Sequence, residues 1–198
     1  MKFKTTSMKK ILLLVLTMAL FNCSKDENDD NSSICNDSEI AFLKEGNTWS
    51  YNIKSLGFDN GELTLTIKNC NGEDYSIDRI AKNSSFDELL TGSDLWEETS
   101  DFIVANTVGN ENAKIYKKNA KLGDTWMYTQ KDGGVVTYEI IKMDSIITVP
   151  AGTFSCKVYK YNATDIINES FVFWNDEIGQ IKENAGFVSL ELSNYSVD

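Results

Sequence analysis

The sequence predicts a mainly β protein: a single domain of antiparallel meander strands that forms a curved sheet or an open barrel, with one or two short helices. Two observations carry this prediction. Runs rich in β-branched and aromatic residues alternate apolar with polar side chains, as in the run that contains Leu63, Leu65 and Ile67. Turn-forming residues interrupt these runs at short intervals. The body of about 165 residues is long enough for one hydrophobic core.

The first half of this body combines strands with two predicted helices. Residues 37–45 are expected to form a short helix, because polar capping residues begin the segment and Gly46 suits the position after its end. A second helix is expected at 85–91, where Ser85 and Glu88 have the spacing of a capping box. The strands expected around these helices span residues 48–56, 62–69, 95–104 and 113–117.

Two Asn-Gly pairs predict turns in this half. Asn60-Gly61 predicts a tight hairpin turn between the first two strands, because both residue types tolerate the positive φ of such turns. Asn71-Gly72 predicts the next turn, which leads into a strand around Tyr75.

The second half shows a clearer strand pattern. Its runs are β-branched or aromatic and are separated by Asp-Gly-Gly, Pro-Ala-Gly, Asn-Asp-Glu and Asn-Ala-Gly. These spacings favour an antiparallel meander. The predicted strands are residues 125–130, 135–149, 153–162, 170–174, 179–182 and 187–192.

A six-residue pattern, Gly-(Asn/Asp)-Thr-Trp-x-Tyr, occurs twice. It begins at Gly46 and again at Gly123, 77 residues later. In each copy a glycine turn and a polar residue precede Trp and Tyr, which share one face of the strand that follows. The repeat indicates one device for starting a strand, and a duplicated half-sheet is a possible origin.

Four motifs of the second half occur together: Gly-Asp-Thr-Trp at 123–126, Val-Pro-Ala-Gly-Thr-Phe-x-Cys at 149–156, Trp174, and Ile-Gly-Gln-Ile-Lys at 178–182. With them the chain resembles a family of uncharacterised Bacteroidota-type secreted lipoproteins and periplasmic proteins. The resemblance covers roughly residues 42–192 and is clearest from Lys121 onward. It implies a curved antiparallel sheet and brings no activity or catalytic residue with it.

Residues 1–22 have the layout of a bacterial export signal. Four lysines precede an apolar run, residues 11–21, which ends at a cysteine. The run is too short for a bilayer span of about 20 residues. The segment resembles lipoprotein signal peptides in placing Leu20 three residues before Cys23. This resemblance implies that Cys23 carries lipid, including palmitate, and becomes the first residue of the mature chain.

Residues 23–36 are expected to be an acidic flexible tether, and residues 37–198 the β domain. The tether is polar and has nothing to bury, so it is expected to stay solvated. It also resembles the acidic signal that sends Bacteroidota lipoproteins to the cell surface. The expected location is therefore the outer membrane, on the cell surface or alternatively on its periplasmic face, and a simple spacer role remains an alternative.

Charge and composition limit the classes of function. Without residues 1–22 the chain has 15 basic and 30 acidic residues, a net charge near −15. This field repels phosphate backbones and anionic headgroups, so no nucleic acid is expected and membrane contact is assigned to the N-terminal acyl chains. The sequence contains no histidine, which removes Ser-His-Asp and Cys-His catalysis and histidine-based zinc sites.

Three cysteines remain once Cys23 is assigned to lipid. A disulfide between Cys35 and Cys70 is favoured, because it ties the start of the domain to its first hairpin. Cys156 is then a free thiol, and the alternation around it places it on a core-facing strand position. No metal site and no cofactor are expected.

Three further groups of residues have the composition of a functional site. The four tryptophans with eight tyrosines suit a sugar-stacking surface or, preferably, a core. The pairs Glu97-Glu98 and Asp176-Glu177 suit a glycosidase only if acids from different segments flank one cleft. The acids of the tether, Asp26, Asp29 and Asp30, lack the spacing of a calcium loop.

The sequence therefore predicts a lipid-anchored, non-catalytic envelope lipoprotein that binds an unidentified partner or ligand. One alternative is a carrier that holds a lipid or another apolar molecule on a concave sheet, as the outer-membrane lipoprotein carriers that it loosely resembles do. A second alternative is an accessory glycan-binding protein.

Overall fold

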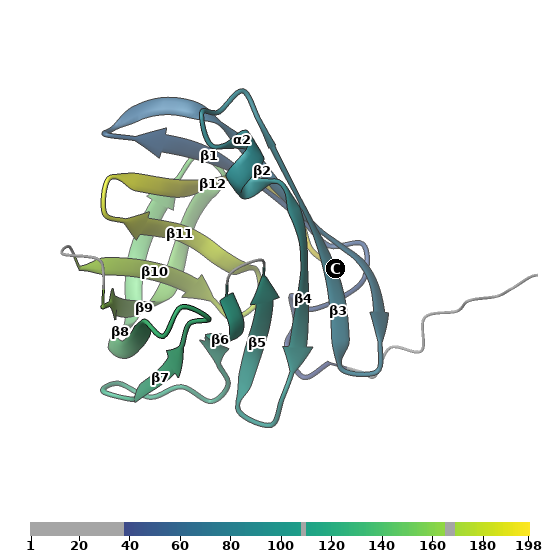
Figure 1. Cartoon of the computed structure of the whole chain (residues 1–198), viewed down its shortest axis with the longest axis vertical. Helices are drawn as coiled ribbons and strands as arrows, with labels where there is room; N and C mark the ends of the chain where they lie inside the picture. Colours follow the sequence, from purple (N-terminus) through teal and green to yellow (C-terminus); the bar gives the residue numbers. More distant parts are fainter. Residues whose placement is uncertain (1–37, 108–109, 165–168) are drawn as a thin grey trace, which may run out of the picture. The chain divides into compact units, whose positions relative to one another are not determined.

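The computed structural model describes residues 38–107, 110–164 and 169–198. Within them the chain forms one antiparallel sheet of twelve strands, which curls into a nearly closed barrel (Figure 1). This confirms the predicted fold class. The export signal, the tether, Cys23 and Cys35 lie outside the described residues. The strands are β1 (Thr48–Ser55), β2 (Phe58–Asn71), β3 (Asp74–Lys82), β4 (Gly92–Glu98), β5 (Phe102–Thr107), β6 (Asn110–Lys117), β7 (Thr125–Thr129), β8 (Val135–Val149), β9 (Gly152–Ala163), β10 (Ser170–Asn175), β11 (Gly179–Ala185) and β12 (Val188–Ser196).

Each half of the chain forms a meander of six strands, and the two meanders join where the first strand pairs with the last. The strand order is β6-β5-β4-β3-β2-β1-β12-β11-β10-β9-β8-β7, so β1 pairs with β12 and the two edges are β6 and β7. Side chains connect these edges. Trp126 on β7 donates from Nε1 to the carbonyl of Lys114 on β6 at 2.9 Å, and Lys117 forms an ion pair with Asp124 at 3.3 Å.

The two halves of the barrel repeat each other strand by strand. Each strand from β7 to β12 begins 77 or 78 residues after its counterpart from β1 to β6. At the start of each half the backbone N–H of a glycine donates a hydrogen bond to a carbonyl of the second strand in that half. Gly46 donates to Ile67 on β2, and Gly123 donates to Ile140 on β8. Both glycines have positive φ, 89° and 82°. The repeated motif thus starts a strand in both halves, as predicted, and the repeat extends to all six strands.

Residues 38–47 form turns, so the helix predicted at 37–45 is wrong for the part that the structure describes. Ser38 Oγ accepts a hydrogen bond from the N–H of Ile40 at 2.9 Å, and this closes a local turn instead of capping a helix. Ile40, Phe42 and Leu43 are all buried, at most 5% exposed, so the segment has no solvent face of the kind an amphipathic helix needs. We call residues 38–47 the plug.

The first hairpin turns at Leu56-Gly57, and not at Asn60-Gly61 as predicted. Leu56 and Gly57 both have positive φ, 51° and 85°, as a two-residue hairpin turn of the primed type requires. The pairing of β1 with β2 shifts register between Asn52 and Lys54, so Asn60-Gly61 lies in a bulge. At Gly61 a Cβ atom would lie 2.4 Å from the carbonyl oxygen of Lys82, which leaves room only for glycine.

Two other details of the first half also differ from prediction. The expected strand 95–104 is divided between β4 and β5, which are joined by a turn closed by Thr99, whose Oγ1 accepts from the N–H of Phe102 at 3.0 Å. The second predicted helix exists as α2 (Asp87–Leu90), but it has no side-chain cap hydrogen bond. Asp87 instead accepts from the N–H of Ser84 at 2.8 Å, ahead of the helix.

The two ends of the barrel differ. The plug lies at the end that holds the β2–β3, β4–β5 and β10–β11 turns, and α2 lies at the opposite end with the β1–β2 and β11–β12 turns. We call these the plugged end and the helix end. Phe42 of the plug reaches the interior, where its ring stacks on Trp174 at 5.8 Å and meets Tyr116 edge-on at 5.4 Å.

Candidate functional site

A cavity of about 250 Å³ lies inside the barrel. Its walls come from both halves of the chain and from α2, and most of them are apolar. We call it the barrel cavity. Its lining residues are Leu63, Leu65, Arg79, Leu90, Asp94, Trp96, Ala105, Thr107, Ile115, Tyr138, Val172, Trp174, Gln180, Glu183 and Leu190.

Glu183 and Gln180 reach this cavity from β11. The pairing of β10 with β11 shifts register next to Trp174, so Trp174 pairs with Gln180 and Val172 pairs with Glu183. This bulge puts two residues that are three positions apart on the same inner face. Gln180 Nε2 then donates to Glu183 Oε2 at 3.3 Å.

The carboxylate of Glu183 has hydrogen-bond donors but no counter-ion. Tyr161 donates from its hydroxyl to Glu183 Oε1 at 2.7 Å. No lysine or arginine forms an ion pair with Glu183 within the described ranges. Burial raises the pKa of Glu183 above its ordinary value, while the hydrogen bonds from Tyr161 and Gln180 act in the opposite direction.

Four tyrosines interact electrostatically with this carboxyl group, and one of them, Tyr161, also forms a hydrogen bond to it. We call them the tyrosine cluster: Tyr51, Tyr128, Tyr138 and Tyr161, from β1, β7, β8 and β9. Burial is the first cause that raises the pKa of each hydroxyl, and the charge of Glu183 raises it further. The hydroxyls therefore stay protonated at neutral pH and can donate hydrogen bonds. Tyr138 stacks between Trp126 at 5.1 Å and Tyr161 at 5.2 Å, which fixes the orientation of the cluster.

The walls of the cavity also carry an ion pair and two polar atoms without a hydrogen-bond partner. Arg79 Nε lies 3.0 Å from Asp94 Oδ2. Asp94 Oδ1 and Trp174 Nε1 have no hydrogen-bond partner, although the two residues are only 7% and 2% exposed. A buried polar atom left unpaired costs about 1–3 kcal/mol. Both residues line the barrel cavity, so a ligand there can offer the missing partners.

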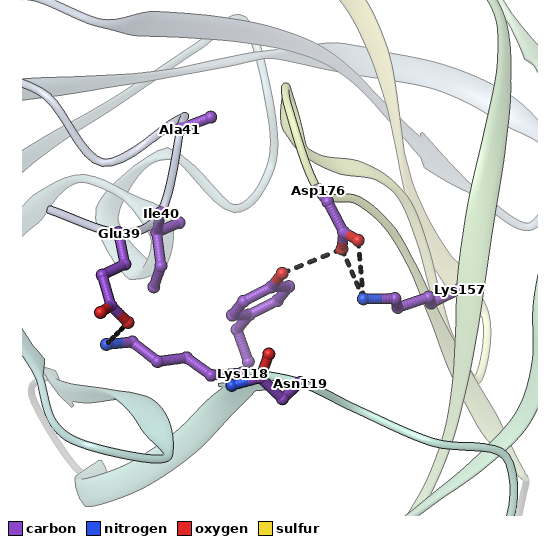
Figure 2. Close-up of a pocket in the computed structure, with 8 residues that line it drawn as sticks. Glu39, Ile40, Ala41, Lys118, Asn119, Lys157 and Asp176 are labelled. Carbon is purple, nitrogen blue, oxygen red and sulfur yellow. Dashed lines mark hydrogen bonds and ion pairs between the residues drawn. The ribbon is translucent and has the colours of Figure 1, made fainter.

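A second pocket, of about 290 Å³, lies beside the plug at the plugged end (Figure 2). Figure 2 shows its charged groups bonded to one another. Asp176 accepts from the hydroxyl of Tyr116 at 2.9 Å and from Lys157 at 2.7 Å. Lys118 lies 3.6 Å from Glu39 and 2.6 Å from Glu98.

One acid from each of the two carboxylate pairs considered for a glycosidase, Glu97-Glu98 and Asp176-Glu177, lies at or next to this pocket. Asp176 lines it, and Glu98 pairs with the lining residue Lys118. Each of these acids forms an ion pair with a lysine, Glu98 with Lys118 and Asp176 with Lys157. The other members, Glu97 and Glu177, do not line the pocket.

All four tryptophans belong to the core. Trp49, Trp96, Trp126 and Trp174 are between 2% and 8% exposed, which confirms the core interpretation and leaves no exposed tryptophan row for stacking on sugars. They also form two pairs related by the repeat, because Trp49 and Trp126 are second in their strands and Trp96 and Trp174 are fifth.

The cysteines agree with prediction as far as the described residues extend. Cys156 is free and buried, as expected, and burial raises the pKa of its thiol to about 11. Cys70 is disulfide-bonded. Because Cys35 lies outside the described residues, the pairing of Cys35 with Cys70 stays a prediction, and so does lipid on Cys23.

Residues 38–107, 110–164 and 169–198 also bear on two other kinds of site. They contain no group of three or more acidic or cysteine side chains placed to hold a metal ion. The same ranges contain no helix that is both long and apolar enough to cross a membrane.

Sequence reasoning missed Glu183 and the tyrosine cluster. The predicted strand 179–182 ended one residue short of Glu183. A signal was present, because strand alternation from the buried Ile181 places Glu183 on the inner face. The cluster itself had no local signal, since its members come from four separate strands.

Comparison with known proteins identifies the fold. No protein-family model and no curated protein matches this sequence. A solved structure from Bacteroides fragilis, assigned as an exported protein with a YmcC-like fold, is similar with a TM-score of 0.53 and 13% identity, over 77% of this chain and 96% of that one. A protein assigned as a lipoprotein from Parabacteroides distasonis has a TM-score of 0.44 and 13% identity over the same shares. At this level of identity the first likeness shows that the chain has the YmcC-like fold.

Proposed function

We propose that this protein is a non-catalytic envelope lipoprotein that binds a small ligand inside its barrel. The observation that carries the proposal is the barrel cavity, which joins apolar walls to a buried donor and a buried acceptor without partners. This combination is typical of small-molecule sites. The absence of histidine and the lysine partners of Glu98 and Asp176 support a binding role over a catalytic one.

The proposed location depends on the N-terminal sequence. The export signal, Cys23 and the acidic tether support a lipid anchor at the outer membrane, with the cell surface as the preferred face. The exported protein from Bacteroides fragilis with the same fold is compatible with this location. Substitution Cys23→Ala is expected to abolish incorporation of labelled palmitate in the native host, and unchanged labelling would reject Cys23 as the lipid site.

The size of the cavity favours a small ligand over a whole lipid. A cavity of about 150 Å³ holds benzene, so one of about 250 Å³ takes a ligand of roughly six to ten non-hydrogen atoms. A carrier of a diacyl lipid would need much more enclosed space. The glycan-binding alternative is weakened by a different observation: all four tryptophans are buried and so are not exposed for stacking on a sugar.

A neutral probe tests the cavity as a binding site. We expect 1-hexanol to bind with a Kd of about 1 mM, because burial of its chain is worth about 4 kcal/mol at roughly 0.8 kcal/mol per methylene. Binding is followed through the fluorescence of Trp96 and Trp174, which line the cavity. The substitution Ala105→Leu narrows the cavity and should weaken binding, whereas Ala151→Leu at the β8–β9 turn should not. No fluorescence response to 1-hexanol, or equal responses in both variants, would contradict the proposal.

A further inference from the structure

We propose that the barrel cavity binds a small organic ammonium ion, with Glu183 as its counter-ion and the surrounding aromatic rings as its walls. This inference rests on the proposed function, because it names the chemical class of the ligand for the same cavity. It is drawn from the charges and rings that line the cavity.

Glu183 is exceptional among the enclosed carboxylates that the structure describes. Asp94 pairs with Arg79, Glu98 with Lys118, and Glu191 with both Lys54 and Lys182. Each of these acids has its cation within the protein.

Glu183 has only the neutral donors Tyr161 and Gln180. Removal of a charge from water without a counter-ion is unfavourable, so a ligand that brings a positive charge gains from meeting this group. The same loss of water around the carboxylate raises the pKa of Glu183.

Two aromatic rings of the cavity suit a cation as well. Trp96 and Trp174 line the cavity. Tyr138 lines it too, but its ring is stacked between Trp126 and Tyr161, so it contributes to the wall and offers no free face. The face of an aromatic ring attracts ammonium groups, most strongly where water is excluded. Apolar residues complete the walls, and they fit the carbon chain of an alkylammonium ion.

Other ligand charges fit less well. An anion would meet the charge of Glu183, and the one arginine of the cavity, Arg79, is already engaged by Asp94. A divalent metal ion prefers several carboxylate or carbonyl oxygens, and only one unpaired carboxylate is present. The orphaned donor at Trp174 Nε1 does not distinguish among these ligands, but it marks the same cavity as a place for one.

Three probes of equal chain length test the assignment on the full mature protein. Hexylammonium, 1-hexanol and hexanoate are titrated by calorimetry at pH 7.5. We expect hexylammonium to bind at least tenfold more tightly than 1-hexanol, because it adds a charge-assisted hydrogen bond and a cation–π contact. Hexanoate is expected to bind more weakly than 1-hexanol.

Two variants assign the preference to Glu183. Glu183→Gln keeps the size of the side chain and should bind hexylammonium and 1-hexanol equally, and its response to 1-hexanol shows that the barrel is folded. Glu111→Gln removes an equal charge from an exposed ion pair with Lys131 and should keep the tenfold preference. The ammonium assignment is overturned if the wild type binds 1-hexanol or hexanoate as tightly as hexylammonium, or if Glu183→Gln keeps the preference. Failure of all three probes to bind would instead overturn the proposed function.

Discussion

Substitution of Phe42 by alanine tests whether the plug is part of the folded core. The side chain of Phe42 is fully buried, and its ring stacks on Trp174 and meets Tyr116 edge-on. Truncation of a buried phenylalanine costs about 3–5 kcal/mol. Two aromatic contacts at about 0.5–1.5 kcal/mol each make up part of this amount. We therefore expect Phe42→Ala to lower the free energy of unfolding by about 3–5 kcal/mol.

Urea unfolding followed by tryptophan fluorescence measures this loss, and the slope with denaturant should not change. Phe58→Ala is the control, because the side chain of Phe58 is 77% exposed at the helix end and its removal should cost less than about 0.5 kcal/mol. A loss below about 1 kcal/mol for Phe42→Ala would refute the reasoning. It would mean that the plug contacts the barrel without stabilising it.

Three further predictions follow from single positions. Gly61→Ala should destabilise the fold by more than about 2 kcal/mol in urea unfolding, since its Cβ would meet the carbonyl of Lys82, whereas Gly57→Ala, with positive φ but open space, should cost only about 1 kcal/mol. Burial raises the pKa of Glu183 above its usual value of 4.5, so the wild type should lose stability as pH rises from 4.5 towards the folded pKa. Glu183→Gln removes this loss. The free energy of unfolding of the variant, relative to that of the wild type, should therefore be higher at pH 8 than at pH 4 in urea unfolding. The same difference at both pH values would contradict this prediction. Cys156, whose thiol pKa is about 11, should react with Ellman's reagent at pH 8 only after denaturant is added, and rapid labelling of the folded protein would show that the thiol is not buried.

Local patterns predicted the second half of the barrel well. The bounds of β8, Val135–Val149, match the predicted strand, because alternation and the flanking glycine and proline turns are both local signals. Errors arose where distant strands decide the local structure. The plug reads as a helix from its own residues, but the barrel surrounds it and buries its apolar side chains on several sides. Asn60-Gly61 has the composition of a turn, but the close approach of Lys82 on β3 makes this pair a bulge.

The site was less predictable than the fold for the same reason. Glu183 is one of many acidic residues in the sequence, and its lack of a cation depends on which side chains the barrel brings near it. The tyrosine cluster comes from β1, β7, β8 and β9, which meet only because β1 pairs with β12 in the middle of the sheet. Neither fact can be derived from the spacing of residues along the chain.

The repeat supports a functional role for Glu183 independently of its surroundings. Residues that serve core packing are expected at equivalent positions in both halves, and the tryptophans are an example. Trp49 and Trp126 each donate from Nε1 to a backbone carbonyl of the other half, at 2.6 Å and 2.9 Å. Glu183 is the fifth residue of β11, and the fifth residue of β5 is the neutral Asn106. An acid enclosed without a cation does not help the fold, so packing alone does not explain why one half carries it. The proposed ammonium ligand would account for this difference between the two halves of the repeat.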